Sequence, residues 1–493
     1  MRILPIYPEY PATFWSFKYA LKFIHKRAAL PPLGLLTVGA MLPNEWPKKL
    51  VDVNVEKLTE KDLAWADYAF ISGMVVQRDS AREIISRCKE ANLKVIAGGP
   101  LFTSEYDQFE DVDHFILNEA ELTLPPFLAD LENGCAQHIY ETSEFCDIRK
   151  TPGPLWDLID SKHYASMSVQ FSRGCPFNCE FCNVTALLGH RPRMKTSEQI
   201  IAELDGLYDQ AWRGQVFFVD DNFIGNKGYL KNQLLPALIQ WQKGKKETPF
   251  STEASVNLAD DPALMEMMVK AGFDTVFIGI ETPDEGSLAE CNKQQNKNRN
   301  LIESVKLIQR SGLQVTGGFI VGFDNDTPSI FQRQIEFIQK SGIVTAMVGL
   351  LNAPPGTRLY ERMKEEGRLI NVISGDNADG TTNILPIMGL DALREGYANL
   401  MQHIYSPEHY YERAMTFLRE YKRPKVRTPM NFQRLLAVLR SSVRLGIFGK
   451  ERFQYWKILS WALFCRPQML PVTITLAIYG HHFRKICKLN IAQ

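Results

Sequence analysis

The chain has few cysteines and no net charge, and each shortage excludes a class of protein. Nine cysteines among 493 residues are too few for a scaffold held together by disulfides. Lysine plus arginine and aspartate plus glutamate number 56 each, so the chain as a whole does not attract nucleic acid electrostatically. A length of 493 residues exceeds one ordinary core and predicts two or three domains.

Long uninterrupted apolar runs are also missing. The N-terminus reads "MRILPIYPEYPATFW" and lacks the apolar stretch of a secretory signal, so we expect a cytoplasmic protein. The apolar run "MLPVTITLAIYG" near the C-terminus has only 12 residues. A helix that spans a bilayer needs about 20. We therefore expect that the tail does not cross a membrane.

The first 130 or so residues alternate short apolar runs with amphipathic stretches. "RILPIY", "YAFISGMV" and "KVIAGGP" predict strands, and "SAREIISRCKEA" predicts a helix. Such alternation predicts a Rossmann-like α/β domain, in which helices cover both faces of a parallel sheet. Ligands of these sheets bind at the carboxyl ends of the strands, which here carry Ser72, Gly73, Gly98, Gly99 and Pro100.

A second alternating series follows an irregular stretch that contains prolines. It has six apolar strand candidates separated by amphipathic helices, whereas a closed barrel needs eight units. The pattern therefore predicts an open, partial (β/α)6 barrel, and beyond about residue 386 only helical patterns continue. We expect a Rossmann-like domain at 1–135, a linker at 136–165, the partial barrel at 166–385 and a helical, basic region at 386–493.

Three cysteines are crowded into one motif. The other six are scattered, and we expect ordinary buried thiols at Cys88, Cys135, Cys146, Cys291, Cys465 and Cys487. "SRGCPFNCEFC" places Cys175, Cys179 and Cys182 as C-x3-C-x2-C, directly after the first barrel strand. A structural zinc site normally has four ligands, and no second cysteine pair or nearby histidine pair completes the set. A four-iron cluster held by three thiolates has one iron left to bind a small molecule, so we favour the cluster and keep zinc as the alternative.

The run "RGCPFNCEFC" resembles the signature of the radical S-adenosylmethionine (SAM) enzymes. The resemblance implies a [4Fe-4S] cluster whose open iron binds the methionine end of SAM. An electron, supplied by a donor such as ferredoxin or flavodoxin, then splits SAM into methionine and a 5′-deoxyadenosyl radical. The resemblance also implies SAM contacts at looser matches, for which the alternative is packing inside the barrel. These candidates are Phe181, Asp220, Asp221, Glu253, Gly317, Gly318 and Gly322.

The parallel sheet in front of the barrel resembles the cobalamin-binding domain of one large radical SAM subclass. Many cobalamin proteins carry D-x-H-x-x-G, but "DVNVEKL" has Asp52 followed by Asn54 where the histidine stands. The difference implies cobalamin without a lower imidazole ligand, and the alternative is a domain that binds no ligand. The resemblance implies cobalamin contacts at Asn54, Ser72, Gly73, Gln77, Gly98, Gly99, Pro100 and Glu119.

Within this family, "CEFCNVTALLGHRPRMKTSEQIIAEL" and "FFVDDNFIGN" resemble the hopanoid C-2 methylases, and related bacteriochlorophyll side-chain methylases share much of both runs. The resemblance implies that the radical abstracts hydrogen from an unactivated carbon of a lipid or polycyclic substrate. Methylcobalamin then methylates that carbon, with no side-chain acid or base. Two alternatives stay open: a radical SAM enzyme that forms rings or carbon–carbon bonds without methyl transfer, and a non-enzymatic iron–sulfur sensor or scaffold.

The C-terminal tail is basic. Residues 419–488 contain 15 lysines or arginines and two acids, Glu420 and Glu451. Aromatic residues and leucines lie among these cations, which favours peripheral contact with an anionic membrane surface. The alternative is a helical cap over the barrel, and no nucleic-acid-binding module is recognised. The loop "GHRPRMK" is also basic. Its cations either form solvated surface or contact anionic groups, and the sequence leaves both possibilities open for Arg191, Arg193 and Lys195.

Overall fold

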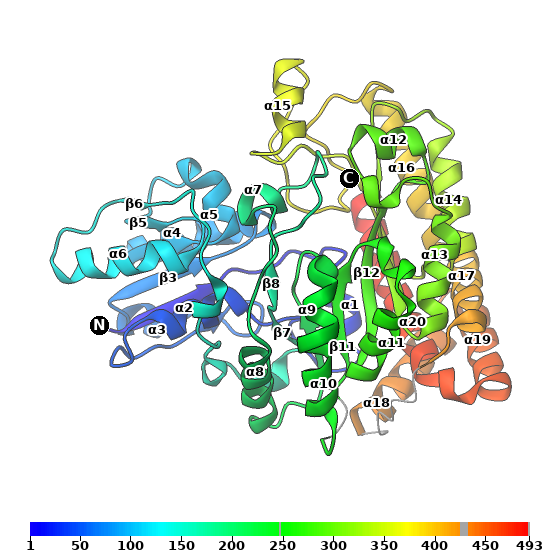
Figure 1. Ribbon diagram of the computed structural model, residues 1–493, viewed down its shortest axis with the longest axis horizontal. Coiled ribbons are helices and arrows are strands. Elements are labelled where there is room, and N and C mark those ends of the chain that lie inside the picture. Colours follow the sequence, from blue (N-terminus) through cyan, green and yellow to red (C-terminus); the bar gives the residue numbers. More distant parts are fainter. Residues whose placement is uncertain (246–247, 424–431, 492–493) are drawn as a thin grey trace.

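The computed structural model describes residues 1–245, 248–423 and 432–491 (Figure 1). In this part of the chain, two separate six-stranded sheets are followed by a region of helices. Neighbouring strands run parallel throughout both sheets. The predicted fold class is therefore confirmed: a Rossmann-like domain, a partial (β/α)6 barrel and a helical C-terminal region.

The front sheet has helices on both faces. Its strands are β1 (Ile3–Tyr7), β2 (Val51–Asp52), β3 (Tyr68–Ser72), β4 (Lys94–Gly98), β5 (His114–Ile116) and β6 (Ile139–Tyr140), in the spatial order β2-β1-β3-β4-β5-β6. Buried side chains of α4 (Arg78–Glu90) and α5 (Pro100–Glu105) cover one face, and those of α6 (Ala120–Glu132) cover the other. Strand β6 pairs with β5, so the front sheet continues into the stretch expected as linker.

The barrel sheet follows chain order. Its strands are β7 (Ser166–Val169), β10 (Gln215–Phe218), β11 (Phe250–Ala254), β12 (Phe273–Glu281), β13 (Gln314–Val321) and β14 (Ala346–Leu350). A short antiparallel ribbon of β8 (Ser172–Arg173) and β9 (Arg193–Met194) flanks the cysteine motif. The first strand, β7, and the last, β14, lie at opposite ends of the sheet, so the sheet is open. Because all its strands run parallel, their carboxyl ends lie along one edge.

Local sequence signals explain where the barrel helices begin and end. Helix α8 (Ser197–Asp209) begins at Thr196, whose side chain accepts a hydrogen bond from the Gln199 backbone in a capping box. Helices α11 (Pro262–Ala271), α13 (Leu301–Ser311) and α14 (Ile330–Ser341) each end at a glycine with φ of 107°, 110° and 72° respectively. Glycine adopts this left-handed backbone without steric cost, so each helix ends and the chain turns into the next strand.

The C-terminal region consists of α16 (Leu390–Tyr405), α17 (Pro407–Glu420), α18 (Phe432–Ser441), the π-helix η10 (Ser442–Ile447), α19 (Arg452–Cys465) and α20 (Leu470–Ile491). These helices lie on the side of the barrel away from the front domain (Figure 1). Phe483 of α20 stacks on Phe14, with 4.2 Å between ring centroids, so the tail also contacts the chain that leaves β1. Among the described helices, none combines the length and apolar character needed to cross a bilayer.

The prediction of buried thiols is correct for four of the six scattered cysteines. Cys88, Cys146, Cys291 and Cys487 are buried, but Cys135 and Cys465 are exposed. Cys135 directly follows the left-handed Gly134 beyond α6, and Cys465 is the last residue of α19. Both therefore lie where the chain leaves the packed layers, which the spacing of cysteines in the sequence does not reveal.

Candidate functional site

The carboxyl edges of the two sheets meet. The chain leaving β1 reaches the barrel, where Trp15 Nε1 lies 2.9 Å from Met347 Sδ of β14. The Trp15 ring also packs edge-on against Phe277 of β12, with 5.6 Å between centroids. Beyond β3, Arg78 Nη2 donates to the carbonyl of Ile373, which follows β14. The edges at which both fold types bind ligands therefore face a shared region.

The cysteine loop is anchored at both ends. Gly174 has a φ of 90°, and a Cβ there would lie 2.8 Å from the carbonyl of Gly189, so the loop closes on itself where only glycine fits. The buried Asp220 carboxylate accepts hydrogen bonds from the backbone and hydroxyl of Ser172. Inside the loop, Glu180 forms an ion pair with Arg362 at 2.9 Å. These contacts hold the strand and loop that present the thiols.

The three thiols are partly withdrawn from water: Cys179 is buried, and Cys175 and Cys182 are half-buried. Burial raises the pKa of Cys175 above its ordinary value and that of Cys182 to about 12, and the neighbouring thiols add to both shifts. Among the described residues, no three His, Cys, Asp or Glu side chains are close enough to share one metal ion. A [4Fe-4S] cluster takes one thiolate at each of three separate corners, and its irons supply the positive charge that buried thiolates need. The donor set therefore fits a cluster.

A buried ion pair beside the thiols was not predicted from the sequence. Lys293 Nζ lies 2.6 Å from Glu281 Oε1 and 6.0 Å from the centroid of Phe181. Burial works to lower the pKa of Lys293, but Glu281 and the thiol of Cys179 together raise it. Next to this pair, Gln295 Nε2 lies 3.9 Å from Cys179 Sγ. The sequence did contain one indication of this pair: a carboxylate at the end of a buried strand, followed closely by the polar run "NKQQN".

Three carboxylates predicted to contact SAM lie close together, but their surroundings differ. Asp220 is occupied in holding Ser172, and burial raises its pKa to about 7. Asp221 accepts a hydrogen bond from the backbone of Gly174 at 3.3 Å. Burial raises the pKa of Glu253 to about 8, and the charges of Asp221 and Asp220 add to that shift. Such a concentration of acid groups favours binding of an ammonium group.

Replacing Glu253 with glutamine is expected to raise the melting temperature of the cofactor-free protein by a few degrees at pH 8. In the unfolded chain this carboxyl ionises near pH 4.5, whereas in the folded protein it ionises only near pH 8. Wild type therefore loses stability as the pH rises through that window, and the variant does not. Thermal unfolding between pH 5 and pH 8 measures the difference, with the exposed Glu83→Gln as control. A gain that is equal at both ends of the range would contradict this assignment.

The three glycines predicted to contact SAM have different neighbours in the structure. A Cβ at Gly318 would lie 2.7 Å from the Phe277 ring, so Gly318 shares a face of the sheet with Phe277. A Cβ at Gly317 would instead meet Ile343 at 3.1 Å, because successive strand residues point to opposite faces. Gly322 has a φ of 106° and packs against Leu393. Side-chain neighbours surround all three glycines, so their backbone contact with SAM stays a prediction.

The predicted cobalamin residues lie at the carboxyl edge of the front sheet. The Asn54 and Gln77 amides both donate to the carbonyl of Pro8, so they shape the chain that leaves β1. Gly99 has a φ of 87°, and a Cβ at Gly98 would lie 2.6 Å from a backbone carbonyl. These side chains and glycines keep the edge compact. Ser72, Gly73 and Pro100 lie at the same edge.

This edge also exposes apolar side chains. Met74, directly after Gly73, is 45% exposed, and Val372 is 65% exposed. A Cβ at Gly375 would lie 2.9 Å from the carbonyl carbon of Val75, so the two loops touch. A flat, largely apolar ring system covering these side chains would remove that surface from water. The exposed Met74, together with Val372 of the loop that touches it, is the observation that favours a corrin ring at this edge.

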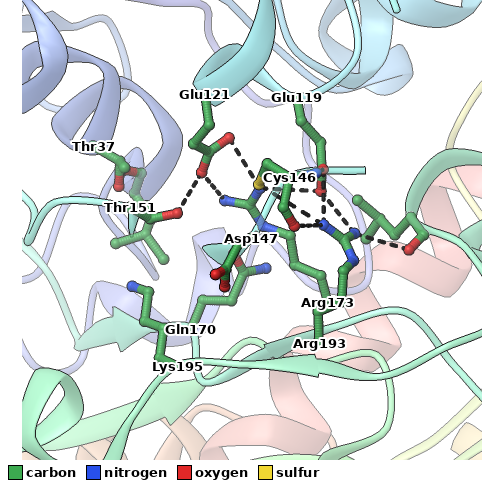
Figure 2. A network of polar contacts seen from close by, with 12 residues as sticks. Thr37, Glu119, Glu121, Cys146, Asp147, Thr151, Gln170, Arg173, Arg193 and Lys195 are labelled. Carbon is green, nitrogen blue, oxygen red and sulfur yellow. Dashed lines mark hydrogen bonds and ion pairs between the residues drawn. The ribbon is translucent and has the colours of Figure 1, made fainter. Parts of the chain in front are cut away.

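Glu119, another predicted cobalamin contact, lies instead in a network between the domains (Figure 2). Its buried carboxylate accepts two hydrogen bonds of 2.8 Å from Arg193 and one of 3.2 Å from Arg173. Arg173 Nη2 also lies 2.8 Å from Glu121 Oε1. Two acids of the front domain thus hold two arginines of the β8–β9 ribbon; we call these four residues the clamp.

The clamp is strongly ionic. Burial works to raise the pKa of the Glu121 carboxyl, but its hydrogen bond to Arg173 and the charge of that residue outweigh burial and hold the pKa at about 2. Two cations of the loop "GHRPRMK" contact anionic groups and do not form solvated surface. Arg193 binds Glu119, and the buried Lys195 pairs with Glu203 at 2.5 Å. Arg191 is exposed.

Comparison with known proteins identifies the family. Residues 169–338 match the family model described as the Radical SAM superfamily, and residues 357–493 match a domain of unknown function (DUF4070). The chain is 34% identical over 470 residues to the hopanoid C-2 methylase of Rhodopseudomonas palustris, which covers 92% of this chain and 88% of that protein. The chain belongs to the family of radical SAM methyltransferases that includes this hopanoid C-2 methylase.

Two further proteins are similar to this methyltransferase over its whole length. An uncharacterized methyltransferase of Synechocystis sp. is 41% identical over 505 residues, covering 100% of this chain and 94% of that protein. The solved structure of the cobalamin-dependent SAM radical enzyme OxsB has a TM-score of 0.64 at 15% identity, covering 100% of this chain and 80% of the other. The second match shows a shared fold. The prediction of an enzyme of this family is confirmed, and the sensor or scaffold alternative is set aside.

Proposed function

We propose that this methyltransferase adds a methyl group to an unactivated carbon of a polycyclic lipid of the hopanoid class. The observation that carries the proposal is the 34% identity to a hopanoid C-2 methylase along 92% of this chain. The apolar wall formed by Trp15, Phe277 and Met347 supports it, because such a wall suits a fused hydrocarbon ring system. A lipid substrate also implies peripheral contact with a membrane.

We assign the cluster to Cys175, Cys179 and Cys182. The Lys293 ammonium, held by Glu281, places a positive charge beside these thiols and offsets the negative charge that thiolates bring into a buried site. When bound, the cluster and SAM supply a radical that abstracts hydrogen, and cobalamin supplies the methyl group. A one-electron donor such as ferredoxin or flavodoxin fits this chemistry.

We further propose that the acid groups near the cysteine loop hold the SAM ammonium. Asp221 and Glu253 are the candidates, since Asp220 is already bound to Ser172. The raised pKa of Glu253 means that an incoming cation would draw a proton off this carboxyl and gain a buried ion pair. Phe181 and Gly318 lie beside this region and are proposed to contact the rest of SAM.

The front sheet is proposed to hold cobalamin along Ser72, Gly73, Gly98, Gly99 and Pro100. Asn54 occupies the position where many cobalamin proteins carry a histidine, and its amide is bonded to Asp52 and Pro8. An amide so occupied is not available as a lower ligand. The clamp then keeps this edge opposite the cysteine loop, so that both cofactors face one substrate.

Deuterium transfer tests the proposed reaction. The anaerobically reconstituted full-length protein is incubated with cobalamin, a one-electron reductant, bacterial lipid extract and SAM carrying a CD3 group. We expect a hopanoid in which CD3 has replaced one hydrogen, and no such product with unlabelled SAM. A ring-closed or carbon–carbon-coupled product without deuterium would support the alternative radical chemistry. Unlabelled lipid together with cleaved SAM would overturn the proposed substrate.

A further inference from the structure

Helices α18, η10 and α19 present an apolar face to solvent. Along α18 and η10, every fourth residue on one side is apolar: Leu435, Leu439, Val443 and Ile447 are 48%, 55%, 48% and 55% exposed. A spacing of four keeps side chains on one side of a helix. This stripe therefore faces away from the barrel over its whole length.

Helix α19 continues the apolar face. Its outer side carries Phe453, Trp456, Leu463 and Phe464, which are 73%, 43%, 51% and 82% exposed, while its inner side buries Tyr455 against the core. A helix that is apolar all round is normally covered on all sides, by protein or by lipid. Within the described part of the chain, only the inner side of α19 is covered.

The two stretches form one surface. Trp456 Nε1 donates to the carbonyl of Gly446 in η10 at 2.9 Å, and Ser441 and Tyr455 hydroxyls lie 3.1 Å apart. Phe448, which is 81% exposed, lies between them in the chain. The apolar patch is defined as Leu435, Leu439, Val443, Ile447, Phe448, Phe453, Trp456, Leu463 and Phe464. Contiguous apolar patches of this kind mark interaction sites.

Within residues 432–491 the exposed charge around the apolar patch has one sign, and Glu408 of α17 is an acid that lies beside Lys450. Residues 432–491 contain a single acid, Glu451, which is buried and pairs with Arg484 at 2.5 Å. The exposed charges between the apolar positions are cationic: Arg444, Lys450, Arg452 and Lys457. An apolar surface with a cationic surround matches a bilayer that carries anionic headgroups.

A depression beside the patch supports the same partner. It has a volume of about 370 Å³ and is lined by Lys22, Phe23, Leu439, Arg440, Val443 and Arg444. Three of its lining residues are apolar and three are cations. This combination fits a phosphate-bearing headgroup above the start of an acyl chain.

We propose that the apolar patch docks this protein on the surface of a bilayer containing anionic phospholipid. A second copy of the chain is a poorer partner, because pairing this face with itself would bring like charges together. The inference goes beyond the proposed reaction, since docking requires neither cofactor nor turnover. On this proposal, the region that matches DUF4070, residues 357–493, serves in access to lipid.

The docking face is connected to the barrel interior. Lys22 and Phe23, which line the depression, belong to the same short segment as Trp15, whose indole contacts Met347 inside the barrel. Phe14 and Phe17 of this segment pack on α20. A lipid held at the patch would therefore lie next to the segment that forms part of the proposed substrate wall.

Vesicle co-sedimentation of the full-length protein tests the proposal. We expect binding to vesicles of equal parts phosphatidylcholine and phosphatidylglycerol, weaker binding to phosphatidylcholine alone, and loss of binding at high salt. The triple variant Phe448→Gln, Phe453→Gln and Phe464→Gln removes only exposed rings, so it should fold, and its binding should fall at least about tenfold. Lys450→Gln with Lys457→Gln should weaken binding only to the anionic vesicles.

Matched controls keep the test decisive. Leu307→Gln with Ile387→Gln changes two side chains that are 44% and 69% exposed outside the patch, and should leave vesicle binding unchanged. SAM cleavage by the triple variant should match wild type, which separates docking from the proposed reaction. Unchanged vesicle binding by the triple variant would overturn the proposal. A dimer in sedimentation that the triple variant abolishes would assign the patch to chain–chain contact instead, and so would also overturn it.

Discussion

The Cys179→Ala variant is expected to lose bound iron, from about four atoms per chain to almost none, and with it all SAM cleavage. In the proposed site three thiolates hold the cluster, and a cubane left with two protein ligands is not expected to be retained. Cys179 is the most buried of the three, at 8% exposed. Iron analysis and detection of 5′-deoxyadenosine by mass spectrometry measure the two losses.

The control for this prediction is Cys465→Ala. Cys465 is an exposed cysteine at the end of α19 and has no place in the proposed site, so iron content and SAM cleavage should both match wild type. Circular dichroism checks that Cys179→Ala still folds, since the change removes a single sulfur atom. A variant that retains four irons and cleaves SAM would refute the assignment. A single zinc in the wild type would establish the alternative left open by the motif.

The second large effect is expected from Arg193→Ala in the clamp. Removing one partner of a buried ion pair costs about 3–5 kcal/mol when the other charge is left uncompensated. Glu119 keeps its hydrogen bond of 3.2 Å from Arg173, so we expect a loss at the lower end of that range. Arg193 is 18% exposed and Glu119 is 3% exposed, so little solvent screens the pair. Urea unfolding measures the loss, and the double variant with Glu119→Ala should lose less than the sum of the two single changes.

Clamp variants should also separate two activities. In the proposed reaction, SAM cleavage uses the barrel alone, whereas methyl transfer also requires the front domain to face the cysteine loop. We therefore expect Arg193→Ala to reduce methyl transfer more than SAM cleavage. The control is Arg149→Ala, because Arg149 and Asp147 form a well-exposed pair in the same region, with no measurable change expected. Equal losses of both activities would contradict a role in domain placement.

The clamp also has a predictable dependence on pH. The pKa of Glu121 in the folded protein is about 2, below its ordinary value of 4.5. Its contribution to stability is therefore present above pH 4.5 and is lost as the pH falls toward 2. The effect of Arg173→Ala, which removes the partner of Glu121, on unfolding should accordingly shrink under acid conditions.

Much of the fold could be predicted from the sequence, because it depends on local patterns. Short apolar runs between amphipathic stretches identify strands buried on both faces, and all six barrel strands were found in this way. The C-x3-C-x2-C motif predicts the cluster ligands, since ligand spacing within one loop is a local property, and that assignment stays a prediction. Helix ends at Gly272, Gly312 and Gly342 follow from the backbone freedom of glycine.

Glu119 shows why the remainder required the tertiary structure. It lies in a loop of the type that holds cofactors, yet its carboxylate binds Arg193, which is 74 residues away in the chain. Likewise, Lys293 gains significance only because folding brings it next to Cys179. The pairing of distant charges depends on how two domains dock, and no local pattern encodes that docking.

The sequence by itself determined the chemistry of this protein: three thiols in one loop, a preceding parallel sheet and a basic, aromatic tail. The tertiary structure decided which of those residues act together. It separated acids that secure the domain interface from acids near the cysteine loop, and apolar tail residues that fill the core from those of the exposed patch. The physical reason is that burial and charge pairing are set by long-range packing, whereas motif spacing and hydrophobic periodicity are local.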